Sequence, residues 1–166
     1  MSISFSISYF YLLIFLSYFF LASIYDLKSR SVPNLLHFLF ILSGFPIFLY
    51  LNFLKGTDPG SGLIAGSLTR FIPGIILTLI SIASKGGLGI GDAVFITVSA
   101  FFIPLNYILT LIVSGFLTAF ITSTGILIYG KIKGKNLYSV SLPLIPLMLP
   151  GLYFILRDME YTGGFL

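Results

Sequence analysis

Long apolar runs separated by short polar breaks are the feature that most constrains how this chain can fold. The runs cover residues 3–25, 35–54, 63–83, 92–130 and 141–156. A helix needs about 20 consecutive apolar residues to cross the hydrocarbon core of a bilayer. Charged residues make up only 8% of the 166, against about 25% in a soluble domain. The pattern predicts an all-α, polytopic integral membrane protein, and it excludes a soluble enzyme, a disordered chain and a nucleic-acid binder.

One of these runs is too long for a single span. Residues 92–130 contain Pro104, and proline disfavours helix in the residue before it. We therefore expect a short helix over residues 92–103 and a longer one over residues 106–130. With this division, the chain has about six transmembrane helices at roughly 20 residues each.

The first and last runs carry further structural signals. Residues 3–25 lack a preceding basic segment and are too long for a signal-peptide core, so we expect a retained helix. The break after this run is expected over residues 26–34. The last run is expected to be kinked or partly unwound and lodged among other helices, because broken backbone is costly in lipid; it contains Pro143, Pro146 and Pro150. We expect one membrane-embedded domain over residues 1–166, with no soluble domain.

Basic residues collect on one side of the predicted spans. The loops after the first, third and fifth helices hold Lys28, Arg30, Lys85, Lys131, Lys133 and Lys135, and the opposite side holds Lys55 and Arg157. The positive-inside rule places the first set in the cytoplasm and both termini outside, in a multi-pass protein of the cytoplasmic membrane. The chain crosses twice between Asp26 and Asp92, so both aspartates are predicted on the cytoplasmic side.

Two carboxylates that meet at a low-dielectric boundary cannot both ionise easily, so the pKa of one rises and the pair shares a proton. Such a pair can activate water and protonate a carbonyl oxygen. This aspartic-protease chemistry needs no metal or cofactor, and it suits a chain with one His and no Cys. The simpler alternatives are that Asp92 is a helix N-cap and that Asp26 is only the first polar residue after a span. Intramembrane acids are usually functional, which favours the pair.

Three segments of the chain are DLKSRSVPN at residues 26–34, KGGLGIGD at 85–92 and LPLIPLMLPG at 142–151. Together they resemble motifs of the type IV prepilin and preflagellin peptidases, a family of GxGD membrane aspartyl proteases. Residues 26–34, DLKSRSVPN, resemble the family's D-x-[KR]-x-x-x-[IV]-P-N element. Residues 85–92, KGGLGIGD, resemble its GxGD element, and residues 142–151 resemble its late Pro-x-x-Pro segment with the Gly that follows. The order of these elements and the six-span layout also match, so the resemblance covers most of the chain.

The resemblance implies a membrane aspartyl endopeptidase that removes the basic leader from pilin, pseudopilin or archaellin-type precursors. It implies that Asp26 and Asp92 are the catalytic pair, and that Gly89 and Gly91 shape the loop holding Asp92. The remaining motif residues are candidates for substrate binding or structural support: Lys28, Pro33, Asn34, Pro143 and Pro146. The expected partners are the precursor and the lipid bilayer, with no nucleic acid, and nothing in the sequence indicates a homo-oligomer.

Two departures from the family pattern narrow this expectation. Many members carry Lys two residues after the GxGD aspartate, where this chain has Val94. The larger members also carry Cys pairs for zinc and an N-methyltransferase activity, and this chain has no Cys. It resembles the short, peptidase-only forms, so we expect no methylation of the new N-terminus.

Several alternatives stay open at the level of sequence. A small transporter or ion-pathway protein could use Asp26 and Asp92 as proton or cation sites, and an inactive assembly factor could retain the motifs. Presenilin-type proteases share a Tyr-Asp plus GxGD pairing, which residues 25–26 match, but they lack the following Pro-Asn. His37 is either an interfacial polar residue or a contact to the catalytic water. Arg70 either snorkels to the interface or forms a buried ion pair.

Overall fold

The computed structural model describes residues 2–50, 67–84, 89–134 and 141–162. The helices are α1 (Ser2–Ser29), α2 (Asn34–Leu49), the 3₁₀ turn η2 (Thr69–Phe71), α4 (Ile72–Ala83), α5 (Ile90–Ser99), α6 (Leu105–Ile132), α7 (Leu144–Leu147) and α8 (Leu149–Thr162). The described residues contain no strand, which confirms the all-α prediction for this part of the chain.

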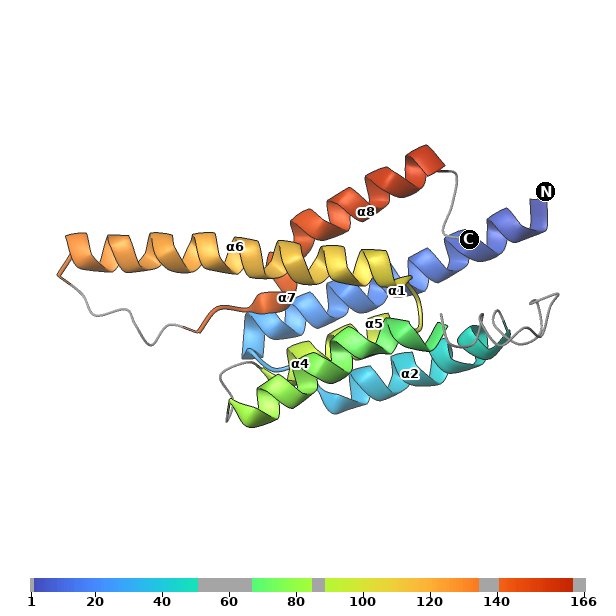
Figure 1. The fold of residues 1–166 in the computed structure, drawn as a ribbon, viewed down its shortest axis with the longest axis horizontal. Coiled ribbons are helices and arrows are strands. Elements are labelled where there is room, and N and C mark those ends of the chain that lie inside the picture. The colour runs from blue at the N-terminus through green and yellow to red at the C-terminus, as the bar shows by residue number, and fades with distance from the viewer. Residues whose placement is uncertain (1, 51–66, 85–88, 135–140, 163–166) are drawn as a thin grey trace.

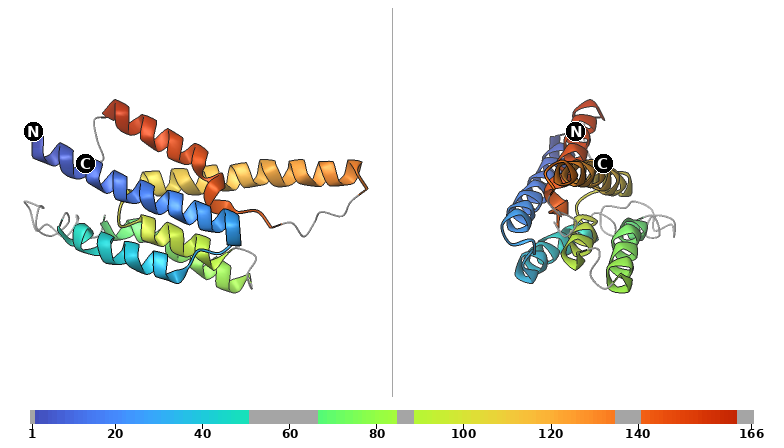
Figure 2. Two further views of the ribbon diagram at one scale, coloured as in Figure 1. Left: turned by 180° about the vertical axis from the view of Figure 1, so that it is seen from behind. Right: turned by 90° about the vertical axis from the view of Figure 1, so that its left-hand side faces the viewer.

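The long helices run back and forth in one elongated bundle (Figures 1 and 2). The last turns of α1 and α4 and the first turns of α2 and α5 lie at the same end of it, on the left in Figure 1. The start of α1 and the end of α8 lie toward the opposite end. Within the bundle, α5 packs on α2 and α4, α7 packs on α1 and α6, and α8 packs on α6.

Both proline-based breaks appear in the structure. Pro104 is the N-cap of α6, with extended backbone at φ −70° and ψ 165°, so the long apolar run is divided as predicted. The division differs in detail, because the short helix covers Ile90–Ser99 instead of 92–103. The last run is interrupted at Met148 between α7 and α8, and α8 continues to Thr162, beyond the predicted end at residue 156.

The prediction that the first helix ends before Asp26 is wrong. Helix α1 continues to Ser29, so Asp26 lies in the last turn of the helix and not in the break. Arg30 ends it in the left-handed region at φ 52° and donates its backbone N–H to the Asp26 carbonyl oxygen at 2.9 Å. Helix propensity carries the chain past the first polar residue, because Leu27 and Lys28 are good helix formers.

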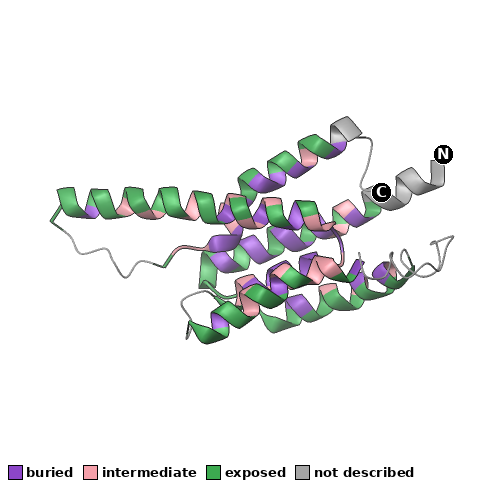
Figure 3. Cartoon of the chain, in the orientation of Figure 1, coloured by how far each residue is buried: buried purple, intermediate pink, exposed green. Residues whose placement is uncertain are grey.

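Aromatic rings dominate the core between α1 and α5. Phe15, Tyr18 and Phe19 from α1 are fully buried, as is Phe95 from α5. The rings of Tyr18 and Phe95 are stacked with centroids 5.0 Å apart, and Phe19 meets Phe95 edge-on at 5.8 Å. Figure 3 shows that the buried residues face the inside of the bundle while the outer faces of the helices are exposed. The aromatic contacts hold α5 in a fixed place against α1.

Much of the exposed surface is apolar. Two of the described helices, over Phe10–Ser29 and Leu105–Ile132, are long and apolar enough to cross a membrane. Three shorter helices, over Asn34–Leu49, Thr69–Ala83 and Ile90–Ser99, are also apolar. Helix α6 extends past the rest of the bundle (Figure 1). The predicted spans also include residues 51–54 and 63–66, which lie outside the described residues.

Helices α4 and α5 approach so closely at Gly74 that no side chain fits there. A Cβ at this position would lie 2.8 Å from the backbone Cα of Thr97. Gly74→Ala should therefore lower the free energy of unfolding by about 1–3 kcal/mol, the usual cost of overpacking. The matched control is Gly125→Ala in α6, where an added Cβ meets nothing within 4 Å. Thermal unfolding in detergent should show a lower midpoint for Gly74→Ala only; equal midpoints would contradict the packing.

Candidate active site

A cavity of about 290 Å³ opens at the end of the bundle where α1 and α4 end and α2 and α5 begin. Its wall consists of Asp26, Arg30, Ser31, Val32, Asn34, His37, Gly89, Ile90, Gly91, Asp92 and Val94. Both aspartates singled out in the sequence therefore line one cavity, although 66 positions separate them in the numbering. Lys85, Gly86 and Gly87, the first residues of the second motif, lie outside the described residues.

Asp26 is buried, with 6% of its surface exposed. Its Oδ2 accepts a hydrogen bond from the backbone N–H of Ile145 at 3.1 Å. Ile145 belongs to α7, the short helix that Pro143 begins as N-cap and that contains Pro146. The two prolines thus shape the segment that reaches Asp26, and the hydrogen bond fixes how the carboxylate is oriented.

Asp92 is the third residue of α5, and it is half-buried. The interpretation of Asp92 as a plain N-cap is wrong, because Gly89 occupies that position with φ −62° and ψ 127°. The Gly89 carbonyl oxygen accepts the Asp92 backbone N–H at 3.1 Å, which leaves the carboxylate of Asp92 at the cavity wall. A negative charge in the first turn of a helix is favoured by the helix dipole.

The two motif glycines differ in what surrounds them. A Cβ on Gly89 would lie 2.7 Å from Oδ2 of Asp92, whereas on Gly91 the nearest atom would be the backbone nitrogen of Val32 at 3.8 Å. Neither glycine has a positive φ. Gly89 is therefore needed for the space that the Asp92 carboxylate takes up, and Gly91 is not under the same restriction.

The residues of the first motif separate into two groups. Asn34 lines the cavity, but Lys28 is exposed and does not. Pro33 also stays outside the cavity wall and is the N-cap of α2, where its carbonyl oxygen accepts the Leu36 N–H at 2.9 Å. Pro33 thus sets the start of α2, the helix that carries Asn34.

Arg30 is a cavity residue that the sequence assigned only to topology. Its guanidinium donates from Nη1 to Oγ of Ser141 at 2.7 Å, which links the end of α1 to the segment leading into α7. This contact and the Asp26–Ile145 bond join the same two parts of the chain. Two residues after Asp92, Val94 lines the cavity with an apolar side chain.

His37 is buried inside the protein, because only 4% of its surface is exposed. It lines the cavity, and its Nδ1 lies 2.7 Å from the hydroxyl oxygen of Tyr18. The sequence could have indicated that His37 lines the cavity, because His37 follows Asn34 by three residues and both therefore lie on one face of a helix. Arg70, by contrast, is half-buried in η2 and does not line the cavity.

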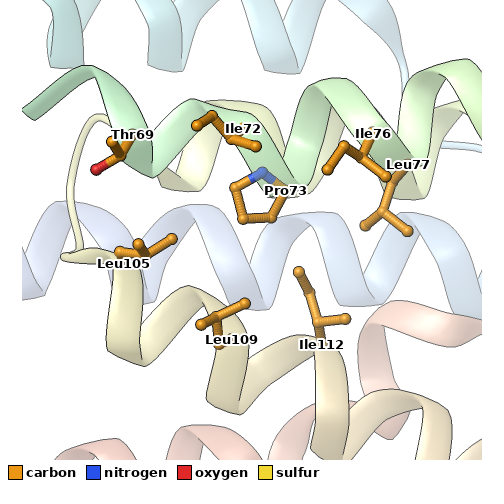
Figure 4. A pocket seen from close by; sticks show the side chains of 8 residues that line it. All are labelled: Thr69, Ile72, Pro73, Ile76, Leu77, Leu105, Leu109 and Ile112. Atoms are coloured by element: carbon orange, nitrogen blue, oxygen red, sulfur yellow. The ribbon is translucent and has the colours of Figure 1, made fainter. Parts of the chain in front are cut away.

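A second cavity, of about 520 Å³, lies between α4 and α6 and shares no lining residue with the first. Figure 4 shows its apolar wall, in which Thr69 supplies the single hydroxyl among the labelled side chains. Among the residues that the structure describes, this second cavity therefore lacks the acidic and basic side chains that acid–base chemistry requires. Within the described part of the chain, no three His, Asp or Glu side chains are grouped as a metal site would require.

Comparison with known families bears directly on this cavity. A model described as the type IV leader peptidase family matches residues 13–130, which is more than half of the 166 residues and includes both Asp26 and Asp92. The chain belongs to the type IV leader peptidase family. Membership confirms the resemblance found in the motifs and makes the chain a protease of the leader-peptidase kind.

The match to the type IV leader peptidases ends before α7. The contribution of Pro143 and Pro146 to the site is therefore inferred from the geometry around Asp26. No curated protein matches the chain, and no solved structure does.

Proposed function

We propose that the chain is a membrane aspartyl endopeptidase that removes the basic leader from prepilin-like precursors at the cytoplasmic face. The observation that carries this proposal is the single cavity lined by Asp26 and Asp92 in a member of the type IV leader peptidase family. Each aspartate comes from one of the two motifs, and helices α1 and α5 bring them together.

The chemistry requires only the two carboxyl groups and one water. The ionised carboxylate takes a proton from the water as the water oxygen attacks the scissile carbonyl carbon. The protonated carboxyl group gives its proton to the carbonyl oxygen, forming a gem-diol. The peptide C–N bond then breaks as the leaving nitrogen takes a proton from the pair. One water is consumed, and the products are a carboxylic acid and an amine.

The exposed surface supports the proposal that about six helices cross the membrane. Large apolar side chains face outward along the described helices, including Ile132 at 78% and Phe120 at 71% exposure. In water this surface would be an aggregation hazard, whereas in lipid it is the expected exterior. The proposed spans add residues outside the described ones to the shorter helices α2 and α4.

The basic residues support the proposed orientation. Lys28 and Arg30 follow Asp26 at the cavity end of the bundle, and Lys131 and Lys133 close α6, which extends beyond that same end. The positive-inside rule then puts the cavity at the cytoplasmic face. An ion pathway would place its acids near the middle of the membrane, and the position of Asp26 and Asp92 at helix ends argues against that function.

Purified protein in detergent tests the proposal directly. The substrate is a precursor with a short basic leader, a Gly and a long apolar helix. We expect cleavage between the leader and the apolar helix, with an unmethylated new N-terminus by mass spectrometry. The rate should be unchanged by EDTA, because the carboxylate pair needs no metal. A precursor left intact would refute the peptidase, and loss of cleavage in EDTA would refute the metal-free mechanism.

A further inference from the structure

His37 brings a third helix into the aspartate cavity. Asp26 and Asp92 come from α1 and α5, and His37 comes from the first turns of α2. The side chain of His37 is 96% buried, from an exposure of 4%, and it lines the same cavity. The proposed carboxylate chemistry makes no use of this imidazole.

The Tyr18 hydroxyl determines which imidazole nitrogen carries the hydrogen. Tyr18 is fully buried, and within the described part of the chain Nδ1 of His37 is the one acceptor near its hydroxyl, at 2.7 Å. A buried O–H without an acceptor is costly, so the Tyr18 O–H donates to Nδ1. In an imidazolium both nitrogens are donors, which would leave Tyr18 without an acceptor. His37 is therefore neutral, with its hydrogen on Nε2.

Two aromatic rings hold Tyr18 in place. The Tyr18 ring lies 4.7 Å from that of Phe40 in α2 and 5.0 Å from that of Phe95 in α5, centroid to centroid. Phe95 is one turn past Asp92 on the same helix. The packing that fixes α5 therefore also fixes the hydroxyl that orients His37. The Nε2–H of His37 is a donor with a set direction before any substrate binds.

Nε2 of His37 is buried and has no hydrogen-bond partner among the described residues. An unmatched buried donor costs about 1–3 kcal/mol, so such a group in a native structure calls for a functional explanation. A peptide cleaved in this cavity brings carbonyl oxygens, which are acceptors. The attacking water is a poorer partner, because a hydrogen bond donated to its oxygen lowers the nucleophilicity that the attack requires.

We propose that the Nε2–H of His37 donates a hydrogen bond to a carbonyl oxygen of the bound precursor, at or next to the scissile peptide bond. Tyr18 is the positioning residue that keeps this hydrogen on Nε2. The inference rests on the proposed peptidase function and deepens it. The scissile oxygen gains charge as water attacks, and a preorganised donor stabilises that charge more than it stabilises the ground state.

Two substitutions of His37 test the roles of its two ring nitrogens separately. His37→Asn places an amide oxygen near the position of Nδ1, so Tyr18 keeps an acceptor, but nothing reaches the position of Nε2. His37→Gln extends an amide N–H toward the position of Nε2 and gives up the Nδ1 acceptor. We expect kcat to fall about 10²-fold in His37→Asn, as when an oxyanion donor is removed, with little change in KM. His37→Gln should recover a large part of this loss.

Tyr18→Phe tests the positioning role. The variant keeps the stacked ring and removes only the hydroxyl, so we expect kcat to fall by less than in His37→Asn while KM stays unchanged. Each variant is assayed on the same precursor as the wild type, and its thermal midpoint in detergent reports folding. A Tyr18→Phe enzyme with wild-type kcat would overturn the positioning role.

Other outcomes decide the inference itself. Wild-type kcat in a folded His37→Asn would overturn it, as would an active His37→Asn beside an inactive His37→Gln, since that pattern means only the Tyr18 contact matters. These results require that the wild type cleaves the precursor, so they leave the peptidase function standing. If the wild type does not cleave, the proposed function fails and the inference fails with it.

Discussion

Asp26→Asn and Asp92→Asn should each abolish precursor cleavage, lowering kcat by about 10²–10⁴-fold, the range that a positioned acid or base contributes. An amide can neither take a proton from the water nor give one to the leaving nitrogen. A single substitution at either position is therefore expected to block both proton transfers. Because the two groups act as a pair, the double variant should lose little more activity than either single variant. The initial rate of leader release, measured at equal amounts of folded protein, checks this result.

Asp158→Asn is the matched control. Asp158 in α8 lies outside the aspartate cavity and accepts a hydrogen bond from the Tyr107 hydroxyl at 2.8 Å. An Asn there keeps an oxygen that can accept the same hydrogen bond, so wild-type cleavage is expected. Full activity in Asp26→Asn or in Asp92→Asn would contradict the carboxylate mechanism, regardless of the activity of Asp158→Asn.

Gly89→Ala has the second largest expected effect. The added methyl group would stand 2.7 Å from Oδ2 of Asp92, and the carboxylate, at the end of a flexible side chain, is what must move. A displacement of about 1 Å at a reacting group can cost roughly 10² in rate, so we expect about that loss in kcat. The thermal midpoint should change little, because no backbone atom of the described residues lies in the way of the methyl group.

Gly91→Ala provides the comparison, since it makes the same change two residues away in the same motif. Its added methyl group would have Val32 nitrogen as nearest neighbour at 3.8 Å, an ordinary contact. We expect near wild-type kcat. If both alanine variants cleave equally well, then the Gly89–Asp92 contact has no role in placing the carboxylate.

The sequence was sufficient for features that depend on local chemistry and on counting. Pro104 breaks the long run where proline must break a helix, and Pro143 begins a segment too irregular for one straight helix. An even number of crossings between Asp26 and Asp92 predicted that both would be at one end, and the cavity contains both. Each of these inferences used a residue's intrinsic preference or the direction of the chain.

The sequence could not predict which distant groups meet. The Arg30 contact to Ser141 spans 111 positions in the numbering, and no periodicity encodes such a pairing. Sequence alone did not show that His37 is buried, because its burial depends on Tyr18, which packs against Phe40 and Phe95. Asp92 was one candidate for the N-cap of α5, whereas backbone geometry gives that position to Gly89. Tertiary packing decided the first two features, and local backbone geometry decided the third.

The bond from Ile145 to Asp26 also has a consequence for how the protein is made. The carboxylate is synthesised 119 residues before the N–H group that orients it. Both aspartates have been synthesised when α5 is complete, but the Ile145 N–H that Asp26 accepts follows only with α7. A growing chain that already contains both acids therefore still lacks the contact that orients the Asp26 carboxylate. In the proposed mechanism, peptide-bond hydrolysis begins only after the last proline-rich segment has folded back against the first helix.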